Sequence, residues 1–269
     1  MYPEINLIFT RIGSFTLFAG MGLVSLVCLA LRQAKTLRLD GHTEQLVMQS
    51  IPIVVIPAVI PAALADIVFR WPRFVGNPQG FGVAFYGWLI GCISGWFLYG
   101  MAVKLRPRFI LNYFAPSLAL AQSIGRIGCF LGGCCYGRPV GRAFGVIFPE
   151  RSLPWIRYGS APLCPVQLLD SFWLFCVFMI LSRRVPFRFR MPAYLTLVGV
   201  GRFFTEFLRG DDRGTFFGID QLSPAQCTSA LLVVCGVTFG LVYILSDLGK
   251  RRHSSEEQDR SSLNAHEEL

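Results

Sequence analysis

The chain has 269 residues, of which 53% are hydrophobic and only 15% are charged, and its formal net charge is +9. A water-soluble domain of this length carries more charge, so most of the chain is predicted to lie in lipid. The cations fall in short loops between apolar runs, where membrane topology accounts for them. No folded basic domain is predicted, which excludes nucleic acid as a partner.

Seven apolar runs are long enough to cross a bilayer, which takes about 20 helical residues. The sequence therefore predicts an all-α polytopic membrane protein with about seven transmembrane helices. The predicted spans lie near residues 7–31, 46–69, 82–103, 109–131, 165–182, 191–209 and 224–246. We expect residues 1–250 to form one transmembrane domain and residues 251–269, which are polar and lack apolar periodicity, to be a disordered tail.

Loop cations predict the orientation of the spans. One set of loops holds thirteen Lys and Arg residues and the opposite set holds seven. The positive-inside rule then places the N-terminus outside and the C-terminal tail in the cytoplasm. The long connection 132–164 and the loop 210–223 face outward, and most of the unusual residues gather there.

Charged side chains inside predicted spans cost at least about 2.5–3.5 kcal/mol each, so each one needs a reason. Six residues qualify: Arg11, Asp66, Arg126, Asp170, Arg202 and Glu206. For Arg11 and Asp66 we favour simple pairing that holds helices together, because nothing near them suggests chemistry.

The stretch GVGRFFTEFLRGDDRG places three charged residues on one helical face. Arg202, Glu206 and Arg209 follow an i, i+4, i+7 spacing. Two arginines to one glutamate leave a positive surplus, to which Arg126 and Arg138 add. Arginine binds phosphate bidentately and keeps its charge when partly desolvated, so the cluster indicates a phospholipid head group. The structural alternative is an Arg–Glu clamp between helices.

Small and polar residues near these charges support a site. Gly125 and Gly128 flank Arg126 and leave room for a ligand or for a neighbouring helix. Gln167 and Asp170 share one face of the fifth predicted span and are candidates for binding substrate, although a glutamine there is also typical of a helix–helix hydrogen bond. Ser223 and Pro224 form a predicted helix start, with Gln226 just inside it.

Four cysteines lie close to this region: Cys129, Cys134, Cys135 and Cys164. They lack the C-x2-C spacing typical of zinc sites, so no metal site is predicted. Inert thiols that shape the pocket are the favoured interpretation. One alternative is a disulfide between Cys164 and Cys134 or Cys135, because the outer side permits oxidation. The other alternative is a metal-binding or catalytic role for the thiols.

Five motifs, in order, resemble those of the prolipoprotein diacylglyceryl transferases of bacterial membranes. They are GVAFYGWLIG, GRIGCFLGGCCYGRP, CPVQLLD, GRFFTEFLRGDD and LSPAQCTS, and they run from the third predicted span nearly to the seventh. The second is similar to the family signature. In it Arg126 matches a functional arginine and Gly137 matches the closing glycine. Arg202 matches a second functional arginine, and Glu206 matches its supporting acid.

The resemblance implies a transferase in the bacterial plasma (inner) membrane. It would move the diacylglyceryl group of phosphatidylglycerol to the lipobox cysteine of a prolipoprotein and release glycerol 1-phosphate, without a cofactor or metal. The predicted catalytic residues are Arg126, Arg202, Tyr86 and Glu206. Residues predicted to bind substrate are Arg126, Gly137, Arg138, Arg209, Gln167 and Asp170.

The chain departs from the family pattern at several polar positions. Tyr86 stands where many members carry His, Cys129 and Cys134 replace Asn and Glu of the signature, and Cys164 replaces a later His; Asp170 keeps an acid one carbon shorter. The arginines are kept. Two alternatives therefore stay open: a relative that uses the same lipid with another acceptor, and a non-catalytic phospholipid-binding membrane protein.

Overall fold

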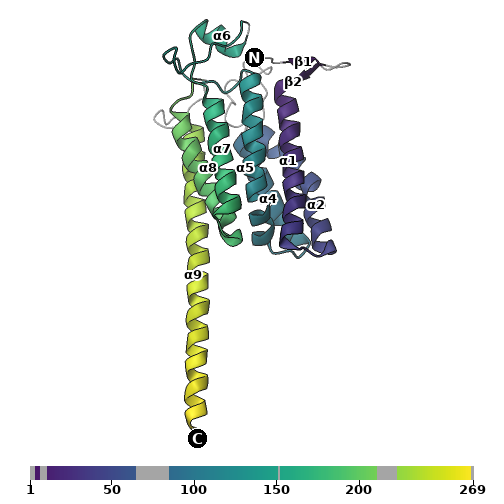
Figure 1. Cartoon of the computed structure of the whole chain (residues 1–269), viewed down its shortest axis with the longest axis vertical. Coiled ribbons are helices and arrows are strands. Elements are labelled where there is room, and N and C mark those ends of the chain that lie inside the picture. The colour runs from purple at the N-terminus through teal and green to yellow at the C-terminus, as the bar shows by residue number, and fades with distance from the viewer. Residues whose placement is uncertain (1–3, 7–10, 65–84, 151, 211–222, 268–269) are drawn as a thin grey trace.

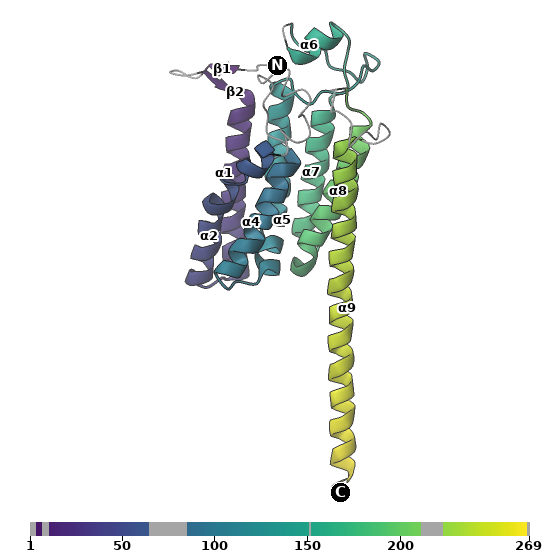
Figure 2. The same ribbon diagram turned by 180° about the vertical axis from the view of Figure 1, so that it is seen from behind.

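A computed structural model describes residues 4–6, 11–64, 85–150, 152–210 and 223–267 of the chain. Long helices lie side by side in a bundle, as Figure 1 and the reverse view in Figure 2 show. The helices are α1 (Ser14–Leu37), α2 (Gly41–Val55), α4 (Phe85–Ala102), α5 (Pro107–Leu131), α6 (Leu153–Tyr158), α7 (Val166–Arg183), α8 (Arg190–Glu206) and α9 (Pro224–Glu267), with a 3-10 turn, η2, at Phe187–Phe189. Two short strands, β1 (Glu4–Asn6) and β2 (Arg11–Gly13), form an antiparallel hairpin before α1.

Five helical segments of the described chain are long and apolar enough to cross a membrane. They are Ser14–Leu37, Gly41–Leu64, Pro107–Leu131, Val166–Arg183 and Pro224–Leu248. Two further helices, α4 with 18 residues and α8 with 17, pack among them. The all-helical membrane architecture is therefore confirmed for these residues, apart from the small hairpin.

The predicted start of the first span is wrong. Arg11 belongs to β2, and α1 begins only at Ser14, so Arg11 lies outside the first candidate membrane helix. The apolar residues 7–9 made the predicted run too long, because hydropathy alone does not separate a short hairpin from a helix end. Asp66, the other residue for which pairing was favoured, lies outside the described residues.

The disordered tail is also a wrong prediction over most of its length. The last helix continues to Glu267, far past the apolar part that ends at Leu248 (Figure 1). This segment contains Glu and Arg residues, which have high helix propensity. A helix already formed in the bundle also extends more easily than a new one nucleates. A domain boundary at residue 250 remains a prediction.

The centre of the bundle is α5, which packs against α1, α4, α7 and α8. Its middle is buried on all sides, and Trp96 of α4 stacks on Phe114 with ring centroids 4.2 Å apart. Ser50 of α2 accepts a hydrogen bond from the Trp96 indole at 3.1 Å, which satisfies the one polar atom of that ring. This packing fixes the first half of α5, and Arg126 lies in the second half of the same helix.

The connection 132–164 forms a small cap over one end of the bundle and carries α6 (Figures 1 and 2). Buried Tyr136, Phe148 and Leu163 form its own apolar cluster. The N-terminal hairpin lies at the same end, and the C-terminal end of α9 lies at the opposite one. The charged residues of α5, α7 and α8 discussed below lie beneath this cap.

Candidate active site

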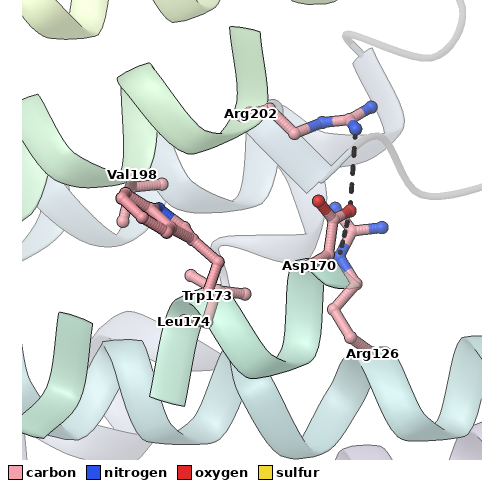
Figure 3. Close-up of a pocket in the computed structure, with 6 residues that line it drawn as sticks. All are labelled: Arg126, Asp170, Trp173, Leu174, Val198 and Arg202. Atoms are coloured by element: carbon pink, nitrogen blue, oxygen red, sulfur yellow. Dashed lines mark ion pairs between the residues drawn. The ribbon is translucent and has the colours of Figure 1, made fainter. Parts of the chain in front are cut away.

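Asp170 joins the two arginines for which the sequence predicted a catalytic role. Its Oδ2 lies 3.5 Å from Nε of Arg126 on α5 and 3.6 Å from Nη1 of Arg202 on α8 (Figure 3). All three residues are buried. Together with the apolar side chains of Trp173, Leu174 and Val198 they line one small cavity. Three helices therefore deliver one charged group each to the same place.

Glu206 holds the second pair of arginines as the helical spacing predicted. Arg202 donates a hydrogen bond through Nη2 to Glu206 Oε2 at 2.6 Å, and Arg209 Nε lies 3.9 Å from the same oxygen. Ser223, at the start of α9, donates to the other oxygen, Oε1, at 3.0 Å. The sequence identified Ser223 only as a helix cap and gave no signal for this contact, which joins two distant segments.

Arg209, at the end of the sixth predicted span, is as deeply buried as Arg202. Only 4% of Arg209 is exposed, against 6% for Arg202. The reason is the chain that covers it: residues 136–138 run antiparallel to residues 208–210, with a bridge between Gly137 and Arg209. Arg209 is thus a member of the buried cluster.

The buried cluster is rich in arginine. Among the residues that the structure describes, Arg126, Arg202 and Arg209 lie close to two acids, Asp170 and Glu206. Arginine keeps its charge when partly desolvated and binds phosphate oxygens bidentately. Guanidinium groups fixed at one small cavity therefore suit a phosphodiester.

Arg138 and Gly137 have positions that the sequence did not predict. Arg138 is exposed and donates from Nε to the carbonyl oxygen of Arg209 at 2.9 Å, so it stands at the rim rather than in the cluster. A side chain at Gly137 would overlap the carbonyl oxygen of Cys164. That close backbone approach accounts for a glycine at this position without any contact to lipid. Substrate binding by either residue stays a prediction.

Tyr86 points into the bundle. Its hydroxyl lies 2.6 Å from Ser229 Oγ on α9. Ser229 donates its own proton to the Ala225 carbonyl at 2.6 Å, so Tyr86 is the donor in the bond between them. The charges of Arg202, Arg126 and Glu206 act on this hydroxyl. Tyr86 therefore adjoins the cluster, although it does not line the cavity.

Both glutamines make local structural bonds. Fully buried Gln167 donates from Nε2 to the carbonyl oxygen of Cys134 at 2.7 Å, which ties the signature loop to α7. Gln226 Oε1 accepts from the Ser223 amide at 3.0 Å while the Ser223 hydroxyl accepts from the Gln226 amide at 3.2 Å. This reciprocal cap starts α9 as the Ser-Pro pair predicted.

The two glycines beside Arg126 serve different purposes. A Cβ at Gly128 would lie 2.7 Å from Cβ of Phe18, so this glycine lets α1 pack closely on α5. A Cβ at Gly125 would meet no atom of the described residues within 4 Å. Helix packing therefore explains Gly128, whereas no described neighbour requires a glycine at position 125.

The cysteines form no disulfide, since all nine are free thiols. Three of them gather: the sulfur atoms of Cys129, Cys134 and Cys135 all lie within 4.8 Å of one another. Hydrogen bonds from the Cys129 and Cys134 thiols lower the pKa of Cys135 well below its ordinary value, with a further contribution from Arg209 and Arg126. Burial raises the pKa of Cys164, which stands apart from the group.

Comparison with known proteins agrees with the motifs. A family model described as prolipoprotein diacylglyceryl transferase matches residues 4–242. The chain belongs to the prolipoprotein diacylglyceryl transferase family. It is 30% identical over 256 residues to phosphatidylglycerol–prolipoprotein diacylglyceryl transferase 2 of Clostridium perfringens, across 91% of this chain and 95% of the relative. The corresponding enzyme of Clostridium tetani is 30% identical over 236 residues, across 84% and 91% of the two chains. That of Halalkalibacterium halodurans is 30% identical over 253 residues, across 87% and 85%.

Membership of the prolipoprotein diacylglyceryl transferase family makes this chain a membrane transferase of lipoprotein biosynthesis. The family resemblance read from five short motifs is thereby confirmed over nearly the whole chain. Neither the family match nor the geometry assigns a catalytic step to any residue. The roles of Arg126, Arg202, Tyr86 and Glu206 therefore remain predictions, now attached to known positions.

Proposed function

We propose that this protein transfers the diacylglyceryl group of phosphatidylglycerol to the lipobox cysteine of prolipoproteins. The relatives named above are phosphatidylglycerol–prolipoprotein diacylglyceryl transferases that align with most of this chain. The observation that carries the proposal is the buried cluster on three helices, in which Arg126 and Arg202 both lie beside Asp170 and line one small cavity. Such a cluster suits a phosphodiester anchored in the same membrane.

The proposed reaction is displacement at an sp3 carbon. The acceptor thiolate attacks the glyceryl carbon, the carbon–oxygen bond to phosphate breaks, and glycerol 1-phosphate leaves with the electron pair. Negative charge grows on the departing phosphate oxygen. Arg126 and Arg202 would stabilise that charge, since both are fixed in advance by Asp170 and are shielded from water. Glu206 would orient Arg202 through its 2.6 Å hydrogen bond.

We further propose seven transmembrane helices in the bacterial plasma membrane, with the N-terminus outside and the C-terminus in the cytoplasm. The loop cations support this orientation. The hairpin and the α6 connection lie at the end opposite the C-terminal end of α9, as the orientation requires (Figure 1). In this arrangement the cluster lies near the outer surface, where a secreted prolipoprotein presents its lipobox.

The test is direct transfer by purified protein. The full chain in detergent, mixed with phosphatidylglycerol vesicles and a lipobox peptide, should yield a thioether-linked diacylglyceryl peptide by mass spectrometry and equimolar glycerol phosphate. A peptide with serine in place of the cysteine is the control and should stay unmodified. Arg126→Ala should abolish transfer while the protein stays folded. A folded wild-type protein that binds phosphatidylglycerol but never modifies the cysteine peptide would instead favour a lipid-binding role.

A further inference from the structure

The turn that follows α5 brings three thiols together. Gly133 and Cys135 have φ angles of +69° and +61°, and the amide of Cys134 donates to the carbonyl oxygen of Cys129 at 3.1 Å. The chain thus folds back on the helix end, and the sulfurs of Cys129, Cys134 and Cys135 lie within 4.8 Å of one another. Sequence spacing gave no such signal, because the turn rather than a C-x2-C knuckle makes the cluster.

The left-handed backbone conformation of Cys135 is unfavourable for a residue that carries a side chain. A left-handed conformation costs a residue with a side chain about 1–2 kcal/mol relative to glycine, and such outliers persist where the surroundings hold them. The Gln167 amide holds this turn by donating to the Cys134 carbonyl at 2.7 Å. Glycine would relieve the strain at position 135. A cysteine there places a third sulfur beside the other two instead.

Three thiolates in this arrangement suit a thiophilic d10 cation. Zinc takes Cys sulfur at about 2.3 Å in tetrahedral sites, and zinc sites that act on substrates keep three protein ligands with the fourth position open. No fourth Cys, His, Asp or Glu among the described residues joins the three sulfurs. A zinc ion with three thiolates carries a net charge of −1, which Arg126 and Arg209, whose charges act on Cys135, would offset.

We propose that Cys129, Cys134 and Cys135 bind Zn²⁺ and that its open position takes the thiol of the acceptor cysteine. This inference rests on the proposed transferase function. Cys129 follows Arg126 by three residues on α5, so the two side chains share one helical face. An acceptor sulfur bound to the metal would therefore reach the site from which phosphate leaves.

The step balances without any redox change. The acceptor thiol gives up its proton to water when its sulfur binds zinc, because a coordinating thiol is deprotonated outright. The bound sulfur then attacks the glyceryl carbon, the carbon–sulfur bond forms, and the carbon–oxygen bond breaks with its electron pair on the phosphate oxygen. The thioether product is neutral and leaves the metal. Coordination also occupies the three protein thiols, which would otherwise compete with the acceptor for the same carbon.

Metal binding is measured first, without reference to activity. The purified full chain, reduced and stripped with a chelator, is titrated with Co²⁺ as a spectroscopic substitute for zinc and then with Zn²⁺. We expect one Co²⁺ per chain with the visible bands of tetrahedral coordination and sulfur-to-metal charge transfer. Zn²⁺ should displace the Co²⁺ and abolish both signals. Cys129→Ser should abolish the signal, and Cys227→Ser, at the start of α9, should leave it unchanged.

A second set of variants guards against loss of fold. Cys134→Ser and Cys135→Ser remove one ligand each from the turn, and the thermal unfolding midpoint shows whether each variant is folded. Loss of the cobalt bands in a folded single variant supports the site. Retention of the bands in all three single variants, or no cobalt binding by the wild type, overturns it.

A separate measurement tests whether the metal binds the acceptor thiol. Addition of the lipobox peptide to the cobalt form should strengthen the charge-transfer band, and the serine peptide should not. A charge-transfer band that does not change with the cysteine peptide would overturn the acceptor role of the metal. Transfer assays separate the two proposals. If a chelator leaves transfer at its full rate, zinc is not needed for transfer and the acceptor role is overturned. If the metal site responds to the peptide but no transfer occurs, the diacylglyceryl transferase activity is refuted and the thiol-binding metal site stands.

Discussion

Replacement of Arg202 by lysine tests whether the site needs a guanidinium fork rather than a positive charge. Arg202 Nη2 donates to Glu206 at 2.6 Å while Nη1 lies 3.6 Å from Asp170. A lysine has a single terminal nitrogen and cannot keep both contacts while it also binds a phosphate oxygen. The net charge of the cluster stays the same, so the change isolates geometry from charge.

The size of the effect follows from the contact that is lost. A hydrogen bond to a charged group contributes about 1.5–3 kcal/mol. Since about 1.4 kcal/mol corresponds to a tenfold change in rate, kcat/KM should fall by about 10- to 150-fold. The phosphate oxygen gains charge in the transition state, so most of this loss should appear in kcat rather than in KM.

The assay is the initial rate of transfer from phosphatidylglycerol vesicles to a lipobox peptide, over a range of lipid concentrations. Arg183→Lys, at an exposed position at the far end of α7, is the matched control and should keep the wild-type rate. Thermal unfolding checks that the Arg202→Lys protein is folded. Turnover within about twofold of the wild type would refute the fork and leave charge alone as the requirement.

Three further substitutions and one chemical modification test the same geometry. Gly128→Ala should lower the thermal unfolding midpoint, because its Cβ would lie 2.7 Å from Cβ of Phe18. Gly125→Ala should leave the midpoint equal or higher, and it should slow transfer if lipid occupies the space beside Gly125. An unchanged transfer rate would place the lipid elsewhere. Asp170→Asn should lower the free energy of unfolding by about 3–5 kcal/mol, because it removes the acid that Arg126 and Arg202 share. Binding of anionic vesicles should persist. An unchanged midpoint in a denaturant titration would contradict the pairing. The pKa of Cys135 is lowered, so its thiolate persists to lower pH than the thiolate of an ordinary cysteine, whose pKa is about 8.5. Iodoacetamide should therefore alkylate Cys135 in metal-free protein at neutral pH. A labelling rate that rises only near a pH of about 8.5 would contradict this prediction.

The sequence predicted the helical bundle well because apolar length is a strong signal in lipid. It erred where hydropathy carries no information on geometry, as at Arg11, which lies in a hairpin strand before α1. The ion pair between Arg202 and Glu206 on α8 was predictable from spacing alone, since the two residues lie four apart on one helix. Periodicity along one helix says nothing of partners on another helix.

The contacts that the sequence could not predict join separate helices or depend on a turn. Asp170 was a candidate for binding substrate, but nothing in its own stretch indicated that Arg126 and Arg202 both lie within 4 Å of it. The depth of Arg209 depends on a loop more than sixty residues earlier, which covers it. The thiol cluster depends on one residue, Cys135, whose positive φ no local pattern announces.

The departures of this chain from its family fall on one side of the reaction. The groups suited to the donor phosphate are kept: Arg126 and Arg202 are buried and lie beside Asp170. The replaced groups are the polar ones that could help an acceptor thiol, and two of the replacements, Cys129 and Cys134, lie in the thiol cluster. A thiol of ordinary pKa near about 8.5 is mostly protonated at neutral pH and needs either a base or a metal to become a nucleophile. Because the Tyr86 hydroxyl donates its proton to Ser229, it offers no ready base, and a metal held by the new thiols would meet the same need.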